Sequence, residues 1–255
     1  MSRNPDFDTL WALAHSSPQL HATSGTHRGG WSRVCRPQAG EILKYQLNYV
    51  RRDWRSLGRL VPTLLCEARA LREVRKRGFT ALPEVRALAG DRRKHPEGPR
   101  AILVMSELTD REPVDHLIAR FRAGELPQRQ WHTLARACGA IIRQLHDAGF
   151  AHCSLRAEHM LARPSETAEY GWDIALIDFE HCRRSPRIYS FWRDLRKLAR
   201  DPACRDLTQS QKLRFYLGYT GEDQLTRRDR FWLRRLAHKL GKKRRRKKKI
   251  MGHTA

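Results

Sequence analysis

The sequence predicts a two-lobed α+β fold, in which a small strand-rich lobe with one helix precedes a larger helical lobe. Strand-like segments and one amphipathic helix fill the chain up to residue 108, and helical periodicity dominates after it. The chain has 255 residues, which is long enough for two lobes with separate cores. Hydrophobic residues make up 40% and charged residues 31%, a balance that suits a soluble globular protein.

The first elements are a short helix and a hairpin. The apolar patch Leu10–Ala14 predicts a loosely attached helix within residues 1–20. Residues 26–36 contain the pair Gly29 and Gly30 followed by alternating side chains, which predicts a β-hairpin. A third strand is predicted over Glu41–Leu47.

One helix and two more strands complete the predicted first lobe. The helix is expected over Leu64–Arg77, and Gly78 is a natural stop for it. Its apolar side chains recur at helical spacing: Leu65, Ala68, Leu71 and Val74. Strands are predicted over Pro83–Ala89 and Ala101–Leu108, with a polar loop over 91–100 between them.

The second half of the chain is predicted to be mainly helical. A long amphipathic helix is expected over Leu134–Ala148, ending at Gly149. Two short strands are expected over Met160–Ala162 and Ile174–Ile177. The predicted parts are a loosely attached segment (1–20), an N-lobe (21–108), a C-lobe (109–226) and a basic helix with its tail (227–255).

Lys44 and Glu67 are the first candidate site residues. Lys44 lies in the middle of an apolar-flanked strand, where an ammonium group needs an anionic partner. Glu67 lies early in the following helix and is the natural partner. Kinases use this order of strand lysine and helix glutamate to hold nucleotide phosphates. The alternative is an exposed edge-strand lysine and an exposed helical glutamate.

Two further segments are candidates for binding a nucleotide. Gly29 and Gly30 lie where backbone N–H groups would cover the phosphates, although the G-x-G-x-x-G pattern is absent. Glu107 and Leu108 follow a buried strand, where backbone groups would pair with an adenine ring. The alternatives are an ordinary hairpin turn and an ordinary strand end.

Asp178 is the candidate metal ligand. It follows the apolar run Ile174–Ile177 and precedes Phe179, and a carboxylate at such a strand end suits Mg²⁺. His159 is a candidate second ligand, because a neutral imidazole can bind a divalent ion, although Mg²⁺ prefers oxygen. The alternative for Asp178 is a capping or turn role.

The segment His152–His159 has the spacing of a protein-kinase catalytic loop. The predicted catalytic residues are His152, which begins the loop, Arg156, which would contact the transferred phosphate, and Ser154. Position 154 is where a kinase has its catalytic Asp, and a Ser hydroxyl cannot accept a proton at neutral pH as a carboxylate does. The alternative is a plain turn between a helix and a strand.

Together these motifs resemble the lipopolysaccharide kinase (InaA/WaaP-like) family of the protein-kinase-like superfamily. The resemblance covers roughly residues 25–200, and its most specific parts are Leu145–His152 and His159. Further matching segments are residues 43–46, 66–71, 101–105, 176–180 and 194–198. The resemblance implies a two-lobed protein-kinase-like fold, with ATP and Mg²⁺ as cofactors. It also implies a sugar of the lipopolysaccharide inner core, heptose or Kdo, as the acceptor. Active members carry Asp where this chain has Ser154.

The C-terminal tail is extremely basic. The net charge of the chain is +24, and the residues from Arg227 onward supply +13 of it, from 14 basic residues and one acid. Lys242–Lys249 is an unbroken basic block, which predicts a disordered arm. The stretch before it predicts a basic amphipathic helix. We expect the block to bind an anionic membrane surface. Nucleic-acid binding is a competing interpretation, and a merely solubilising tail is the plain one.

The sequence therefore favours an ATP-dependent phosphotransferase, weakened by Ser154, in the cytoplasm and peripheral to the inner membrane. The N-terminus lacks the pattern of a signal peptide, and no apolar run is long enough to span a bilayer. The alternatives are a nucleotide-binding pseudokinase scaffold and, more distantly, a nucleic-acid-binding protein. A zinc site made from histidines and cysteines near His152 and Cys182 is conceivable, but its spacing matches no familiar pattern.

Overall fold

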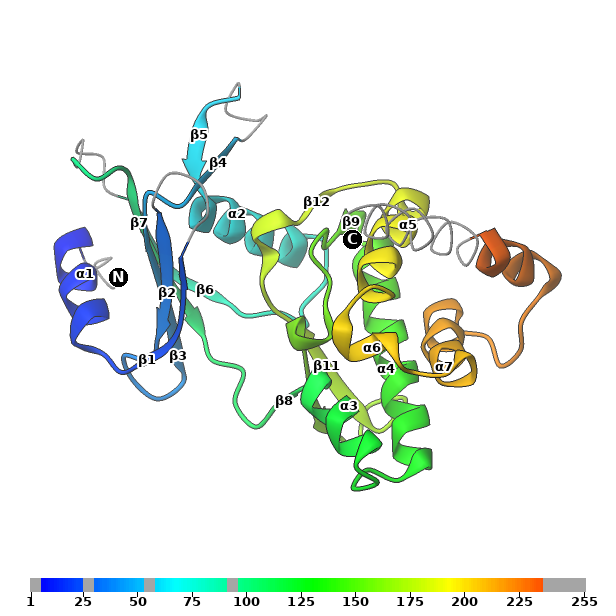
Figure 1. The fold of residues 1–255 in the computed structure, drawn as a ribbon. Coiled ribbons are helices and arrows are strands. Elements are labelled where there is room, and N and C mark those ends of the chain that lie inside the picture. The colour runs from blue at the N-terminus through cyan, green and yellow to red at the C-terminus, as the bar shows by residue number, and fades with distance from the viewer. Residues whose placement is uncertain (1–5, 25–29, 53–57, 91–95, 236–255) are drawn as a thin grey trace, which may run out of the picture. The chain divides into compact units, whose positions relative to one another are not determined.

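A computed structural model describes residues 6–24, 30–52, 58–90 and 96–235 (Figure 1). The chain divides into two compact units. The first contains the chain up to Glu112 together with His159–Arg163 and Ile174–Arg184. The second contains Pro113–Glu158, Pro164–Asp173 and the residues from Ser185 onward. The first unit is rich in strands and the second in helices, as the sequence predicts.

A five-stranded antiparallel sheet forms the centre of the first unit. Its order is β1-β2-β3-β7-β6. The strands are β1 (Gln19–Ser24), β2 (Trp31–Cys35), β3 (Glu41–Leu47), β6 (Val85–Gly90) and β7 (Arg100–Ser106). β3 has the bounds expected from the sequence. β2 lies within residues 26–36, where a hairpin was predicted, but its partner β1 lies before that range and was not predicted.

The N-terminal helix α1 (Phe7–Ser16) covers one face of this sheet. Leu10 and Ala14 of α1 are buried in one core cluster with Leu43 and Tyr45 of β3. The ring of Trp11 also packs edge-on against Tyr45, with centroids 5.7 Å apart. The expectation of a loosely attached segment is therefore wrong, because α1 supplies the apolar cover that this face of the sheet needs.

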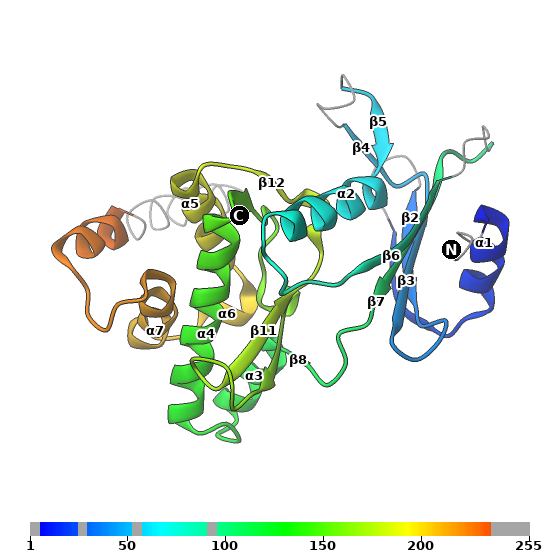
Figure 2. The same ribbon diagram turned by 180° about the vertical axis from the view of Figure 1, so that it is seen from behind.

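The opposite face of the sheet carries helix α2 (Thr63–Lys76) (Figures 1 and 2). Successive side chains of a strand point to opposite faces, so Leu43 and Tyr45 face α1 while Lys44 and Gln46 face α2. The Thr63 hydroxyl at the start of α2 donates to the Gln46 side-chain oxygen at 2.9 Å. The chain reaches α2 through a two-stranded hairpin that the sequence did not predict, β4 (Val50–Arg52) and β5 (Leu60–Pro62).

Two segments from later in the chain belong to the first unit. They contain parts of the neighbouring strands β10 (Met160–Pro164) and β11 (Trp172–Leu176) and the short helix η3 (Phe179–His181). The Leu176 N–H donates to the Ala81 carbonyl at 2.9 Å, and η3 packs against α2. The sequence placed these segments in residues 109–226, because only the folded chain brings them to α2.

The second unit is built from helices. The long helix α4 (Gln128–Asp147) packs along α7 (Gln209–Thr220). A Cβ on Gly139 would lie 2.0 Å from the Phe215 carbonyl oxygen, so glycine permits this close crossing. A further helical segment covers residues 227–235. The other elements of the chain are β8 (Glu112–Pro113), α3 (Val114–Arg122), β9 (Phe150–Ala151), η2 (Ala157–His159), β12 (Arg183–Arg184), α5 (Arg187–Leu198) and α6 (Pro202–Arg205).

Candidate active site

Lys44 and Glu67 form a buried ion pair in the first unit. The Lys44 ammonium lies 2.7 Å from the Glu67 carboxylate, and Glu67 is only 2% exposed. β3 directs Lys44 to the face that α2 covers, and Glu67 lies in the second turn of α2. The pairing predicted from the sequence is therefore present, and the alternative of two exposed side chains is wrong.

Nearby carboxylates favour the charged form of Lys44. Burial by itself would lower the pKa of Lys44, but the charges of Glu67, Asp178 and Glu180 outweigh it and raise that pKa. Burial raises the pKa of Glu67, and the attraction of Lys44 opposes this rise. The Lys44 ammonium group therefore stays protonated among three carboxylates. A cation that binds phosphate oxygens needs this charge.

Asp178 occupies a sharp turn between β11 and η3. Its backbone is left-handed (φ 65°, ψ 58°), a conformation uncommon for a residue other than glycine. Fully buried neighbours, Leu176 before it and Phe179 after it, hold the turn in place. The carboxylate lies 3.4 Å from the His159 imidazole. The structure therefore brings together the two side chains that the sequence proposed as metal ligands.

Glu180 is an additional carboxylate that the sequence analysis did not single out. Its negative charge acts on both Lys44 and Glu67, and its side chain contacts His181 at 2.9 Å. The Arg51 guanidinium from β4 donates to the Glu180 backbone carbonyl. Burial together with the charges of Glu180 and Asp178 also raises the pKa of Tyr49. The hairpin before α2 is thus tied to the turn that carries Asp178.

The described residues fit a magnesium ion better than a zinc ion. In the described ranges, no group of three or more histidine, cysteine, aspartate or glutamate side chains could hold a metal. This rules out the zinc alternative around His152 and Cys182, which both lie in those ranges. Mg²⁺ needs only one or two protein carboxylates, because water and substrate phosphates complete its shell. Asp178, with His159 beside it, supplies such a partial set.

The remaining predicted nucleotide-binding residues have other roles in the fold. Gly30 is buried, and a Cβ there would lie 2.3 Å from the Asn48 carbonyl oxygen, so this position needs glycine for packing. Gly29 lies outside the described residues. The Glu107 carboxylate pairs with Arg36 and its N–H donates to the Gly40 carbonyl at 2.9 Å. The Glu107 N–H is therefore committed to the fold, which leaves its carbonyl and Leu108 as candidate adenine contacts.

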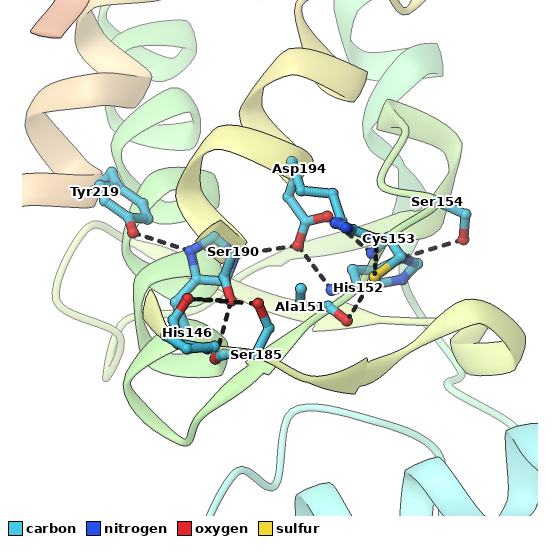
Figure 3. Close-up of polar contacts among 11 residues, drawn as sticks. His146, Ala151, His152, Cys153, Ser154, Ser185, Ser190, Asp194 and Tyr219 are labelled. Atoms are coloured by element: carbon cyan, nitrogen blue, oxygen red, sulfur yellow. Dashed lines mark hydrogen bonds and ion pairs between the residues drawn. The ribbon is translucent and has the colours of Figure 1, made fainter. Parts of the chain in front are cut away.

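The loop His152–His159 is held by Asp194 of α5, whose side chain contacts the start of the loop (Figure 3). One carboxylate oxygen of Asp194 accepts from the His152 N–H at 2.7 Å, and the other accepts from the Cys153 N–H at 2.8 Å. Cys153 has a left-handed backbone (φ 68°), so the chain bends sharply at this point. The start of the loop is thus a turn anchored through its backbone N–H groups.

Two further side chains complete the anchor. The buried His146 of α4 contacts the Asp194 carboxylate at 3.1 Å through one ring nitrogen and the Tyr219 hydroxyl at 2.9 Å through the other (Figure 3). Asp201 accepts the Ala157 N–H at 2.8 Å and so fixes the second half of the loop. The sequence signal for His146 and Asp194 was their presence in the matching segments, but it did not show that they meet.

The three predicted catalytic residues lie together in this loop. The Ser154 hydroxyl is 3.3 Å from Nδ1 of His152, whose ring is fully buried (Figure 3). Arg156 is largely exposed, and its guanidinium pairs with Glu158 at 2.8 Å. Arg156 must exchange this partner before it can contact a phosphate. No carboxylate stands at position 154, where the loop spacing places one in kinases.

Comparison with known proteins decides the family. The sequence model of the lipopolysaccharide kinase (Kdo/WaaP) family matches residues 17–219. The chain belongs to this family. A solved structure described as WaaP in complex with acyl carrier protein has the same fold, with a TM-score of 0.62 over 92% of each chain and 18% sequence identity. No match was found among curated proteins.

Membership of the lipopolysaccharide kinase family confirms the predicted kinase-like fold and supports kinase activity in general. The family connects the chain with kinase activity, with transfer of a phosphoryl group and with lipopolysaccharide biosynthesis. A kinase of this kind implies the use of ATP. The matched region contains both the Lys44–Glu67 pair and the loop with Ser154.

Proposed function

We propose that this member of the family is an ATP-dependent phosphotransferase that acts on a sugar hydroxyl of the lipopolysaccharide inner core, heptose or Kdo. The observation that supports the proposal is the buried Lys44–Glu67 pair with the Asp178 carboxylate acting on the same ammonium. Burying charged groups is costly unless each has a partner. A bound nucleotide would explain why the chain keeps the Lys44–Glu67 ion pair in a buried position.

Each charged side chain has a proposed part in the reaction. Lys44 binds the α- and β-phosphates, and Glu67 orients its ammonium group. Asp178, assisted by His159, would hold the Mg²⁺ that accompanies ATP, and this ion would offset phosphate charge. Arg156 contacts the transferred phosphoryl group after leaving Glu158. Positioning and charge neutralisation supply most of the rate in this chemistry.

Ser154 makes the reaction slow in this proposal. Its hydroxyl, hydrogen-bonded with His152, positions the acceptor hydroxyl but does not take its proton as a carboxylate would. General-base assistance typically contributes about 10²–10⁴-fold to a rate. Ser154 in place of a carboxylate also favours a second candidate function. This is a pseudokinase that binds a nucleotide as a scaffold and transfers no phosphoryl group.

A transfer assay separates the two functions. Purified protein, labelled ATP, Mg²⁺ and inner-core oligosaccharide are expected to give slow labelling of the sugar. Asp178→Ala should abolish this labelling, whereas Asp206→Ala, which changes an exposed aspartate, should not. Ser154→Asp should raise the rate by about 10²–10⁴-fold.

The outcomes of this assay are distinct. Labelling only in Ser154→Asp, with calorimetric binding of ATP by the unchanged protein, would establish the scaffold. Absence of ATP binding in the presence of Mg²⁺ would refute both functions.

We further propose that the protein lies in the cytoplasm against the inner membrane, with Lys242–Lys249 attracted to anionic lipid. No helix in the described part of the chain is long and apolar enough to cross a bilayer. Each basic residue near an anionic surface contributes about 1 kcal/mol. Truncation after Gly241 should weaken binding to anionic vesicles at least tenfold, by roughly 1.4 kcal/mol or more. Unchanged vesicle binding with lost RNA binding would instead favour the nucleic-acid interpretation.

A further inference from the structure

Three large apolar side chains are exposed in the described part of the second unit. Ile188 is 51% exposed, Tyr189 is 67% exposed and Phe231 is 53% exposed. The first two lie at the start of α5, and Phe231 lies in the helical segment 227–235. Single exposed apolar residues are common, but a group of them indicates a surface that binds something.

Packed tryptophans join these two helical segments into one surface. The rings of Trp192 in α5 and Trp232 lie 5.6 Å apart, and Phe231 packs against Trp232 at 5.3 Å. Ile188 lies one helical turn before Trp192, so it projects from the same side of α5. The contact between the two tryptophan rings therefore joins α5 to the segment 227–235, and we name the surface of Ile188, Tyr189 and Phe231 the apolar face.

Arginine side chains lie beside Phe231 on the helical segment 227–235. Five of them on the segment 227–235 are exposed: Arg227, Arg228, Arg230, Arg234 and Arg235. The Arg235 guanidinium lies over the Phe231 ring at 5.6 Å and over the Trp232 ring at 5.8 Å. The acid on this segment, Asp229, accepts hydrogen bonds from Tyr216 and Thr226. The charge at the rim is therefore strongly positive.

We propose that the apolar face docks on the surface of an anionic lipid bilayer, with Ile188, Tyr189 and Phe231 entering the headgroup region. Interfacial segments combine this composition: arginines that attract lipid phosphates, and aliphatic and aromatic side chains that enter the headgroup boundary. This proposal rests on the membrane localisation proposed above. It adds a folded surface to the basic tail as a site of membrane attachment. A folded surface also orients the second unit, which an attracted tail cannot do.

The two kinds of attachment differ in their response to salt. Attraction between the basic tail and lipid is screened by salt, because it acts between solvent-exposed charges. Insertion of apolar side chains depends on area removed from water and is not screened. Docking through the apolar face therefore predicts a salt-resistant part of vesicle binding that the tail does not supply.

Vesicle sedimentation of the full chain tests this, using phosphatidylcholine vesicles with and without phosphatidylglycerol at low and high salt. The double change Ile188→Ser with Phe231→Ser should weaken binding to the anionic vesicles about tenfold and remove the salt-resistant part. The matched control is Leu20→Ser with Leu60→Ser, because these leucines are 49% and 43% exposed in the first unit. The control should bind like the unchanged chain.

Other outcomes overturn the inference. Equal binding by the double variant and the unchanged chain would refute it, as would an equal loss in the leucine control. Acyl carrier protein is present in the solved WaaP structure, so it is tested in parallel. If the double variant lost binding to acyl carrier protein but kept vesicle binding, the face would belong to a protein partner. The assay contains no ATP and no sugar, so its failure leaves the proposed transferase function untouched.

Discussion

The two regions that contain the candidate site residues differ in what holds them. In the first unit, the Lys44 ammonium is paired with Glu67 and attracted by Asp178, so the cation proposed to act is held through its charge. In the second unit, the catalytic-type loop is held by Asp194 through its backbone N–H groups. The side chain at position 154 takes no part in that anchor.

This difference explains how the loop keeps its form with Ser154 in place of a carboxylate. A change at Lys44 or Glu67 leaves a buried charge without its partner, which is costly. The hydrogen bonds from His152 and Cys153 to Asp194 are made by backbone N–H groups and not by the side chain at position 154. The residues proposed to bind a nucleotide and the position proposed to accept a proton are therefore held by different interactions.

The largest expected effect comes from removing the loop anchor. Asp194→Ala leaves two backbone N–H groups and the buried His146 without their acceptor, so we expect a loss of about 3–5 kcal/mol in the free energy of unfolding. Denaturant unfolding measures it. Asp206→Ala, at an exposed surface pair, should change the same quantity by less than about 1 kcal/mol. Similar small effects for both variants would show that the loop does not depend on Asp194.

The second-largest expected effect comes from breaking the Lys44–Glu67 ion pair. Glu67→Gln removes the carboxylate 2.7 Å from the Lys44 ammonium. The ammonium would then turn toward Asp178, whose charge also acts on it. We expect the Kd for Mg-ATP to rise about tenfold to hundredfold, which calorimetry measures. The control is Glu125→Gln, in an exposed pair with Arg120 at 3.6 Å. An unchanged Kd in Glu67→Gln would remove Lys44 from the nucleotide site.

The smallest effect is a pH dependence at the loop anchor. Burial raises the pKa of Tyr219 to about 12, above the ordinary value of about 10. Below pH about 10 the hydroxyl is neutral in both states, so its contribution to stability is fully present. Above that pH the unfolded chain loses the proton first, and stability falls by about 1.4 kcal/mol by pH about 11.

Tyr219→Phe provides the comparison for this pH dependence. Unfolding free energies of the two proteins, measured from pH about 9 to about 11, should converge as the pH rises, because only the unchanged chain loses stability through Tyr219. A constant difference between them would mean that Tyr219 ionises as readily in the folded protein as in the unfolded chain. That result would contradict the close burial of Tyr219 beside His146.

Much of the fold can be predicted from the pattern of apolar and polar residues. The elements that were not predicted have physical explanations. The strand over Glu41–Leu47 was predicted with its observed bounds because its side chains alternate between two covered faces. The strand Gln19–Ser24 was missed because its polar sequence forms a strand only by pairing with β2. The helix Val114–Arg122 was missed although Val114, Leu117 and Ile118 are buried at helical spacing, a signal that the sequence did contain.

The sequence by itself determined the kinase-like order of elements, the family, the pairing of Lys44 with Glu67 and the departure at Ser154. The order of elements, the pairing and the departure at Ser154 depend on periodicity, on spacing and on the cost of an unpaired buried charge, whereas the family follows from the resemblance of its motifs. Only the tertiary structure decided that Asp194 and His146 hold the loop, that Gly30 serves packing and that α1 is part of the core. Each of these depends on atoms that lie far apart in the sequence and meet only after folding, so no spacing in the chain encodes the contact.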